Sequence, residues 1–196
     1  MKKNIYKECL DHAFEEHANV LKNTHMAIAK SAKLSADIIA KSLTSEGTIF
    51  WCGNGGSAAD SQHIAAEFVG RFKKDRRPLR SIALTTDTSV LTCVSNDYSF
   101  EEIFSRQINA LGRNGDVLVV ITTSGNSENI LSVLRKAKEA NIESIALLGK
   151  GGGEAAKIAS RAIIIDSNET ARIQEIHLLI GHTFCEYAEL NVFNLG

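Results

Sequence analysis

Short apolar segments rich in Ile, Val and Leu recur along the chain, and segments with helical periodicity alternate with them. The apolar segments lie at residues 48–52, 81–85, 116–123, 143–148 and 161–165. The helical segments lie at residues 57–71, 99–111, 127–140, 153–159 and about 170–190. Near-continuous apolar strands between helices are typical of a parallel sheet covered on both faces. The sequence therefore predicts an α/β fold, a three-layer α/β/α sandwich with a five-stranded parallel sheet, and leaves the strand order open.

The first 45 residues contain no such strand, and we expect them to form two helices. Their apolar residues recur at spacings of three and four, as on one face of a helix: Tyr6, Leu10, Phe14, Ala18 and Leu21. The 196-residue chain contains one proline, Pro78, and no low-complexity linker. We therefore expect a single domain over residues 1–196, with an N-terminal helical segment (1–45) and an α/β core (46–196).

The composition argues against several classes of protein. A formal net charge of −1 provides no general attraction to nucleic acid or to an anionic membrane. No apolar run approaches membrane-spanning length, and the first residues lack the apolar core of a signal peptide. The four cysteines lie far apart in the sequence and form no CxxC pair. We expect reduced thiols in a cytoplasmic protein rather than disulfides or a cysteine metal site.

A glycine-rich loop, "CGNGGSAADSQ" (52–62), follows the first predicted strand and begins a helix. Its glycines allow backbone N–H groups to approach an anion, and the helix N-terminus adds positive potential. The spacing matches neither GxxxxGK[ST] nor GxGxxG, so a nucleotide P-loop and a dinucleotide loop are both disfavoured. The alternative is a tight turn between strand and helix that binds nothing.

A second loop, "ITTSGNSENI" (121–130), places four hydroxyl groups around Gly125, just before a helix. They belong to Thr122, Thr123, Ser124 and Ser127. Hydroxyls and free N–H groups at a helix start suit a phosphate monoester, and the lack of a nearby lysine favours a small sugar phosphate over a nucleotide. An N-cap at Ser127 would explain one hydroxyl but not four.

Because parallel strands bind ligands at their carboxyl ends, both loops are expected to open onto the same edge of the sheet. A third polar segment, "SNDYSF" (95–100), contains Asn96 and Asp97. Taken alone, it predicts a turn and a helix cap.

His63 and Glu67 lie four residues apart on the helix after the glycine-rich loop, so they share a face with Asp60. This pair suits metal binding or proton transfer, although such spacing also occurs on solvated helices. The last helix carries polar residues within an otherwise apolar sequence: Gln174, Glu175, His177 and His182. A single buried histidine is more often structural than a ligand, and we assign His177 a structural role.

Gln174 and His182 are eight residues apart, which separates them by roughly 12 Å along a helix axis. One helix can hardly bring both side chains to the same ion. If both belong to one site, either the start of the helix is distorted or they come from different subunits, and we favour different subunits. This predicts an oligomer with active sites at the subunit interfaces.

These segments together resemble the SIS (sugar isomerase) family, and within it the phosphoheptose isomerases. The resemblance covers nearly the whole chain and rests on three stretches in the family's order: "CGNGGSAADSQHIAAEFVGRF", "SNDYSFEEIFSRQINALGRNGDVLVVITTSGNSENI" and "ARIQEIHLLIGHTFCE". It implies the SIS fold and a cytoplasmic homotetramer. It also implies interconversion of D-sedoheptulose 7-phosphate and D-glycero-D-manno-heptose 7-phosphate, the first step toward the heptose of the lipopolysaccharide core.

The resemblance also implies roles for individual residues. The hydroxyl loop would hold the phosphate through Thr122, Thr123, Ser124 and Ser127. The sugar would be lined by Asn54, Gly55, Gly56, Asn96, Asp97 and Gln174. Glu67 and His182 look like the catalytic acid–base pair, with Glu67 also in contact with substrate. One zinc ion per subunit is expected on His63, Glu67, Gln174 and His182, although Glu67 cannot be a tight ligand and a free base at once.

Three other functions compete with this one. Similar non-catalytic tetrameric adaptors bind the bacterial replication initiator, but they lack the residues that correspond to Glu67 and His182. A phosphosugar-sensing domain would need a DNA-binding module, for which residues 1–45 are too short. Other phosphosugar enzymes, such as an etherase, fit the site residues less well. The basic stretch at 71–80 is expected to be a solvated loop.

Overall fold

Five parallel strands form the centre of the fold, in the order β2-β1-β3-β4-β5. The computed structural model describes residues 4–193. The strands are β1 (Ile49–Gly53), β2 (Ser81–Ala83), β3 (Val117–Thr122), β4 (Glu143–Leu148) and β5 (Arg161–Ile164). Every strand pair is parallel, and residues of β1 and β3 pair from Ile49 with Val117 to Gly53 with Ile121. The prediction of a five-stranded parallel sheet is thus confirmed.

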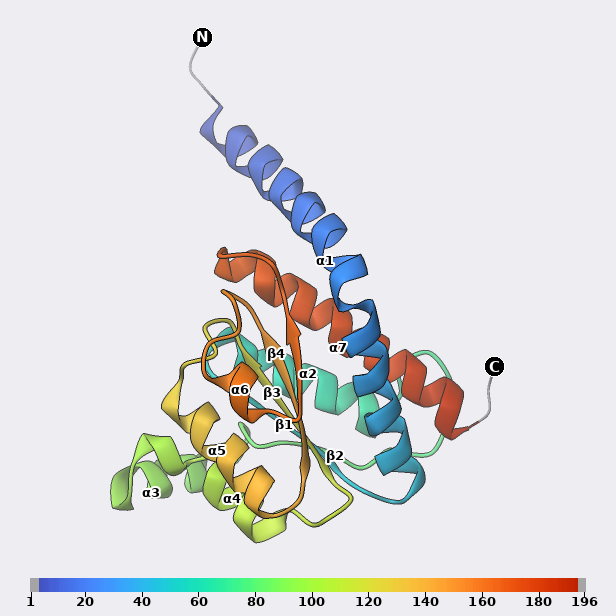
Figure 1. Cartoon of the computed structure of the whole chain (residues 1–196), viewed down its shortest axis with the longest axis vertical. Coiled ribbons are helices and arrows are strands. Elements are labelled where there is room, and N and C mark those ends of the chain that lie inside the picture. Colours follow the sequence, from blue (N-terminus) through green and yellow to red (C-terminus); the bar gives the residue numbers. More distant parts are fainter. Residues whose placement is uncertain (1–3, 194–196) are drawn as a thin grey trace.

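Helices cover both faces of the sheet and complete the three layers (Figure 1). One face carries α1 (Ile5–Thr44), α2 (Gly56–Val69) and α7 (Thr170–Val192). The other carries α3 (Thr88–Asp97), a 3₁₀ turn (Phe100–Glu102), α4 (Ser105–Leu111), α5 (Glu128–Glu139) and α6 (Ala155–Ile158). Successive strand residues point to opposite faces, so that Trp51 packs in the first core and Phe50 in the second.

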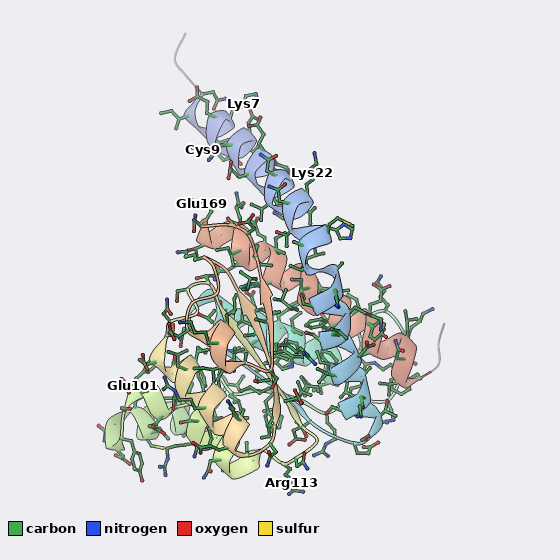
Figure 2. The ribbon with its side chains drawn as sticks, viewed as in Figure 1. Lys7, Cys9, Lys22, Glu101, Arg113 and Glu169 are labelled. Atoms are coloured by element: carbon green, nitrogen blue, oxygen red, sulfur yellow. The ribbon has the colours of Figure 1, made fainter. Side chains whose placement is uncertain are left out.

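The N-terminal segment is one helix of 40 residues, and the prediction of two helices is wrong. The sequence contains no glycine or proline before Gly47, so nothing interrupts the helix. Glu46 adopts a left-handed backbone conformation just after the helix ends. The N-terminal half of α1 projects beyond the three layers (Figure 1), and Figure 2 shows Lys7, Cys9 and Lys22 on this projecting part.

Two further helix predictions need correction. Residues 95–97 form the last turn of α3 rather than a free turn, and Tyr98 caps that helix. The helix predicted at 99–111 is divided into a 3₁₀ turn and α4. In both segments tertiary packing overrides the local preference. None of the helices in residues 4–193 combines the length and the hydropathy that a membrane-spanning segment needs.

Candidate active site

The strand order brings the two predicted anion-binding loops side by side. The chain leaves β1 toward β2 on one side and β3 toward β4 on the other, so the strand order reverses between β1 and β3. Ligands of open α/β sheets bind outside the carboxyl ends of the strands at such a reversal. The glycine-rich loop follows β1 and the hydroxyl loop follows β3, so both lie at this position.

A reciprocal pair of amide hydrogen bonds joins the two loops. The side-chain amide of Asn54 donates to the Oδ1 of Asn129 at 2.9 Å, and the amide of Asn129 donates back to Asn54 at 2.8 Å. Asn129 lies in the first turn of α5 and is buried. It was not among the predicted site residues, because its position two residues after Ser127 resembles an ordinary helix start. The structure shows that it fixes the side chain of Asn54.

The hydroxyl loop is held in a tight turn that a larger residue at its centre would disrupt. Gly125 has a φ of +68°, and a Cβ there would lie 2.0 Å from the carbonyl oxygen of Gly152. The backbone N–H of Gly125 donates to the Oγ1 of Thr122 at 3.3 Å. The 149–154 loop after β4 therefore packs directly against the 122–127 turn and supports it.

Ser127 occupies the N-cap position of α5, every residue of which is described, but its side chain makes no capping hydrogen bond to that helix. The N-cap alternative thus does not account for its hydroxyl. Thr123, Ser124 and Ser127 are each partly exposed at the carboxyl edge of the sheet, whereas Thr122 is buried beneath them. These hydroxyls and the start of α5 form a surface suited to a phosphate monoester.

Three of the predicted catalytic and metal-binding residues converge where α2 and α7 cross. The Nε2 atoms of His63 and His182 lie 2.9 Å apart, so one imidazole donates a hydrogen bond to the other. The Oε1 atom of Glu67 lies 3.8 Å from the Nε2 of His63. Glu67 is a quarter exposed and His63 about half exposed, so a ligand in solution can reach both.

Gly181 makes this convergence possible. A Cβ at Gly181 would lie 2.8 Å from the Cδ1 and Cγ1 atoms of Ile64, which is buried on α2. The missing side chain lets α7 approach α2 closely at the level of His63 and His182. Asp60 lies one turn before His63, and burial raises the pKa of its carboxyl, an effect that the nearby His63 opposes.

Gln174 of the same chain lies apart from His63, Glu67 and His182, next to the glycine-rich loop. A Cβ on Gly56 would come within 2.5 Å of the Nε2 of Gln174, so this side chain lies against the glycine-rich loop. Gly56 and His63 are seven residues apart on α2, about 10 Å along the helix. One chain therefore does not bring Gln174 to His63, Glu67 and His182.

Within residues 4–193, the side chains that could bind a metal form only part of a metal centre. Imidazole nitrogens and a carboxylate are donors that zinc accepts, and His63, Glu67 and His182 supply them. Across residues 4–193, however, no group of three or more His, Cys, Asp or Glu side chains is arranged to hold a metal ion. The two imidazoles instead bond to each other.

The remaining predicted residues lie outside this crossing. Asn96 and Asp97 are exposed at the end of α3, where the Asn96 amide donates to the Asp97 carboxylate at 2.8 Å. His177 is buried, and its Nε2 donates to the carbonyl oxygen of Leu148 at 3.1 Å. Burial lowers the pKa of His177 to about 4, although the bond to Leu148 opposes the shift. His177 is therefore a neutral core residue at neutral pH.

An open parallel sheet with a hydroxyl-rich loop beside its strand-order reversal belongs to the class of α/β domains that bind ligands at the carboxyl edge of the sheet. The family model described as the SIS domain matches residues 12–149. A phosphoheptose isomerase from Campylobacter jejuni is 49% identical over 173 residues, covering 88% of this chain and 92% of that protein. One from Aquifex aeolicus is 56% identical over 154 residues, covering 79% and 81%.

A solved structure shows the same relation at the level of the fold. The phosphoheptose isomerase of Neisseria gonorrhoeae superposes with a TM-score of 0.89 at 40% sequence identity, covering 94% of this chain and 98% of that one. The chain belongs to the SIS domain family, among its phosphoheptose isomerases.

Proposed function

We propose that the protein is an aldose–ketose isomerase that interconverts D-sedoheptulose 7-phosphate and D-glycero-D-manno-heptose 7-phosphate. The observation that carries this proposal is that Glu67 and His182 both lie beside His63 where α2 crosses α7. Glu67 is on α2, which begins at the glycine-rich loop, and His182 is on α7. The names of the relatives, all phosphoheptose isomerases, support it. The product would supply heptose for the lipopolysaccharide core.

The reaction moves a proton between C1 and C2 of the sugar through an enediol intermediate. It therefore needs a base for the carbon-bound proton, an acid for the oxygen, and groups that stabilise developing negative charge on oxygen. Glu67 would act as the base and His182 as the acid. The hydroxyl loop would hold the phosphate, and Asn54, Gly55 and Gly56 would line the sugar.

The adaptor that binds the replication initiator is the alternative from another class. Those adaptors resemble the phosphoheptose isomerases but lack the acid–base residues. This chain has both Glu67 and His182, and its two helices bring them to one crossing. The enzyme is therefore favoured.

We also propose a homotetramer with active sites at subunit interfaces. The projecting part of α1 exposes large apolar side chains, including Tyr6, Leu10 and Phe14. An apolar groove of about 350 Å³ lies between α1 and α7 and is lined in part by Leu21 and Leu179. Helical faces of this kind, exposed to water, favour burial against further copies of the chain.

Assembly offers an explanation for the missing fourth ligand. If Gln174 of a neighbouring copy approached His63, Glu67 and His182, the assembled protein would offer zinc a complete donor set. Metal analysis of the purified oligomer tests this. We expect about one zinc per subunit, and less in Gln174→Ala at unchanged oligomer size. An oligomer that binds no zinc when the metal is added in excess would contradict it.

A cytoplasmic location is part of the same proposal. The structure contains free thiols at Cys9, Cys52, Cys93 and Cys185, which suits a reducing compartment. Burial raises the pKa of Cys52 and of Cys185, so both stay protonated and unreactive.

The experiment that tests the function is turnover of sedoheptulose 7-phosphate by the purified protein, with and without added zinc. We expect the Glu67→Gln variant to lose about 10²–10⁴-fold in kcat, since general acid–base catalysis contributes about that much. Lys74→Ala, an exposed change in the nearby 71–80 loop, serves as the matched control. A folded tetramer without turnover under any metal condition would overturn the proposal and favour the adaptor.

A further inference from the structure

The loop after α2 is fastened to α7 by one buried carboxylate. Glu189 is 1% exposed and accepts three consecutive backbone N–H bonds, from Phe72 at 2.8 Å, Lys73 at 3.0 Å and Lys74 at 3.1 Å. It also accepts a bond from the Nε of Arg76 at 3.0 Å. Burial disfavours its charge, but these four donors outweigh that effect and lower the pKa of Glu189. The carboxylate is therefore charged and fully satisfied.

Arg76 uses the rest of its guanidinium to hold the end of α2. Its side chain is 2% exposed. It donates to the carbonyl oxygens of Glu67 and Phe68 at 2.8 Å each and to that of Gly70 at 3.2 Å. These carbonyls belong to the last turn of α2 or follow it, where helix carbonyls lack partners within the helix. One of these carbonyl groups belongs to Glu67, the proposed base.

The loop that Glu189 holds places an aromatic ring on the proposed acid. The rings of Phe72 and His182 are stacked, with centroids 5.4 Å apart and planes inclined by 18°. The ring of His63 meets His182 edge-on, at 5.2 Å and 80°. The imidazole of His182 thus has one face against Phe72 and one edge against His63, which restricts its rotation.

If the Arg76–Glu189 pair only stabilised the fold, its polar side chains would not be required. Apolar side chains of similar volume often stabilise a protein as well as a buried ion pair does. The Arg76–Glu189 pair differs from an apolar pair because hydrogen bonds have direction. Arg76 holds the backbone of Glu67, and Glu189 holds Phe72, the residue that stacks on His182. Both halves of the acid–base pair are thereby positioned by the same two side chains.

We propose that Phe72 is a positioning residue for His182 and that the Arg76–Glu189 pair holds both Phe72 and the end of α2 in place for proton transfer. The inference rests on the proposed isomerase function. Phe72 does not exchange protons itself. It keeps the imidazole of His182 in the orientation from which the proton is delivered.

The first test compares steady-state kinetics of the full-length oligomer and its Phe72 variants with sedoheptulose 7-phosphate. We expect Phe72→Leu to lower kcat about tenfold with KM within about twofold, because small misplacements of catalytic groups reduce rate more than binding. Phe72→Tyr keeps the stacked ring and is expected to restore kcat to within about twofold. Lys74→Ala is the matched control, since Lys74 bonds to Glu189 only through its backbone N–H.

A second readout follows the imidazole of His182 directly, without turnover. In protein with ¹³C-labelled histidine, Phe72→Leu is expected to shift the His182 ring signals because the ring current of the stacked phenyl group is lost. Glu189→Gln is expected to shift the same signals, although Glu189 lies seven residues, about 10 Å along the helix, from His182. Lys74→Ala should leave them in place.

Several outcomes would overturn the inference. Unchanged kcat in a folded Phe72→Leu variant would do so, as would a change confined to KM, which would make Phe72 part of a binding wall. Failure of Phe72→Tyr to restore kcat would show that stacking is not the cause. If the unmodified protein shows no turnover, the proposed function fails, and the histidine spectra still decide whether Phe72 and Glu189 set the position of His182.

Discussion

Single residues decide how closely the two helices of the site approach each other. Gly181 allows α7 to contact Ile64 on α2, and this contact sets the separation of His63 and His182. His177, one turn earlier on α7, packs into the core beneath the carboxyl end of β4.

Gly181→Ala should separate α2 from α7. The added methyl group would overlap the side chain of Ile64, and overpacking of this kind typically costs about 1–3 kcal/mol. Part of this is offset by the higher helix propensity of alanine, about 1 kcal/mol. We expect a net loss in the free energy of unfolding, measured with urea, and lower kcat. Gly181→Ala combined with Ile64→Val should recover part of both, and an unaffected single variant would contradict the close contact.

His177 should make the protein less stable in mild acid. Its pKa is about 4 in the folded chain and about 6.5 when unfolded, so as pH falls the unfolded state binds the proton first. The stabilisation is complete above pH 6.5 and is lost as pH falls to about 4, by roughly 3 kcal/mol. His177→Gln keeps a donor for Leu148 without titrating. Urea unfolding of both proteins at pH 7, 5 and 4 should show the wild type losing more stability; parallel losses would refute the prediction.

At the scale of elements, two loops that follow adjacent strands act as one unit. The Asn54–Asn129 amide pair links them, and the loop after β4 supports the hydroxyl turn at Gly125. This arrangement keeps the proposed phosphate and sugar contacts at a fixed separation before any ligand arrives.

Asn129→Ala should loosen this link. Removal of one partner leaves the partly buried Asn54 amide without its bonds, at a cost below the about 1–3 kcal/mol of a fully buried group. We expect a raised KM for sedoheptulose 7-phosphate together with reduced stability, measured by steady-state kinetics and by thermal unfolding. Glu128→Ala, an exposed change at the start of α5 outside the pair, is the comparison. If KM rises equally in both variants, the amide pair has no special role in binding.

At the scale of the whole molecule, the C-terminal half of α1 packs on the three-layer body and its N-terminal half projects beyond it (Figure 1). The projecting part contacts the start of α7 through His17, whose Nδ1 lies 2.6 Å from a carboxylate oxygen of Glu175, and through the carbonyl of Ala13, which accepts a bond from Arg172 at 3.0 Å. Val20 is buried, but the large apolar side chains nearer the start of the helix face solvent: Ile5, Tyr6, Leu10 and Phe14. This exposure is what suggests assembly.

Leu10→Glu combined with Phe14→Glu should prevent assembly. Four copies of each charge would be buried in a helical interface, where unpaired carboxylates are strongly unfavourable. Light scattering coupled to gel filtration should show a smaller species than the wild type, with folded secondary structure and little turnover. Lys22→Glu, which changes charge on the same helix, should keep the larger assembly. A variant that stays tetrameric would place the interface elsewhere.

Much of the site was predictable because its signals are local. The hydroxyls of 122–127, the glycines after β1 and the i, i+4 pair of His63 and Glu67 can each be found within about fifteen residues of sequence. Asn129, Phe72, Arg76 and Glu189 could not be assigned in this way. Each of them acts through a partner that is far away in the chain; Arg76 and Glu189, for example, are 113 positions apart. The hydrophobic period of a sequence does not reveal such a partner.

The alternation of strands and helices, the two loops and the set of polar candidates could all be predicted, because they follow from hydrophobic period and residue type. The tertiary structure set the strand order that places the loops side by side. It also decided that His63 meets His182 across 119 residues of sequence while Gln174 lies against Gly56. These outcomes depend on how closely backbones can pack, as at Gly181, and packing between distant segments exists only once the chain has folded.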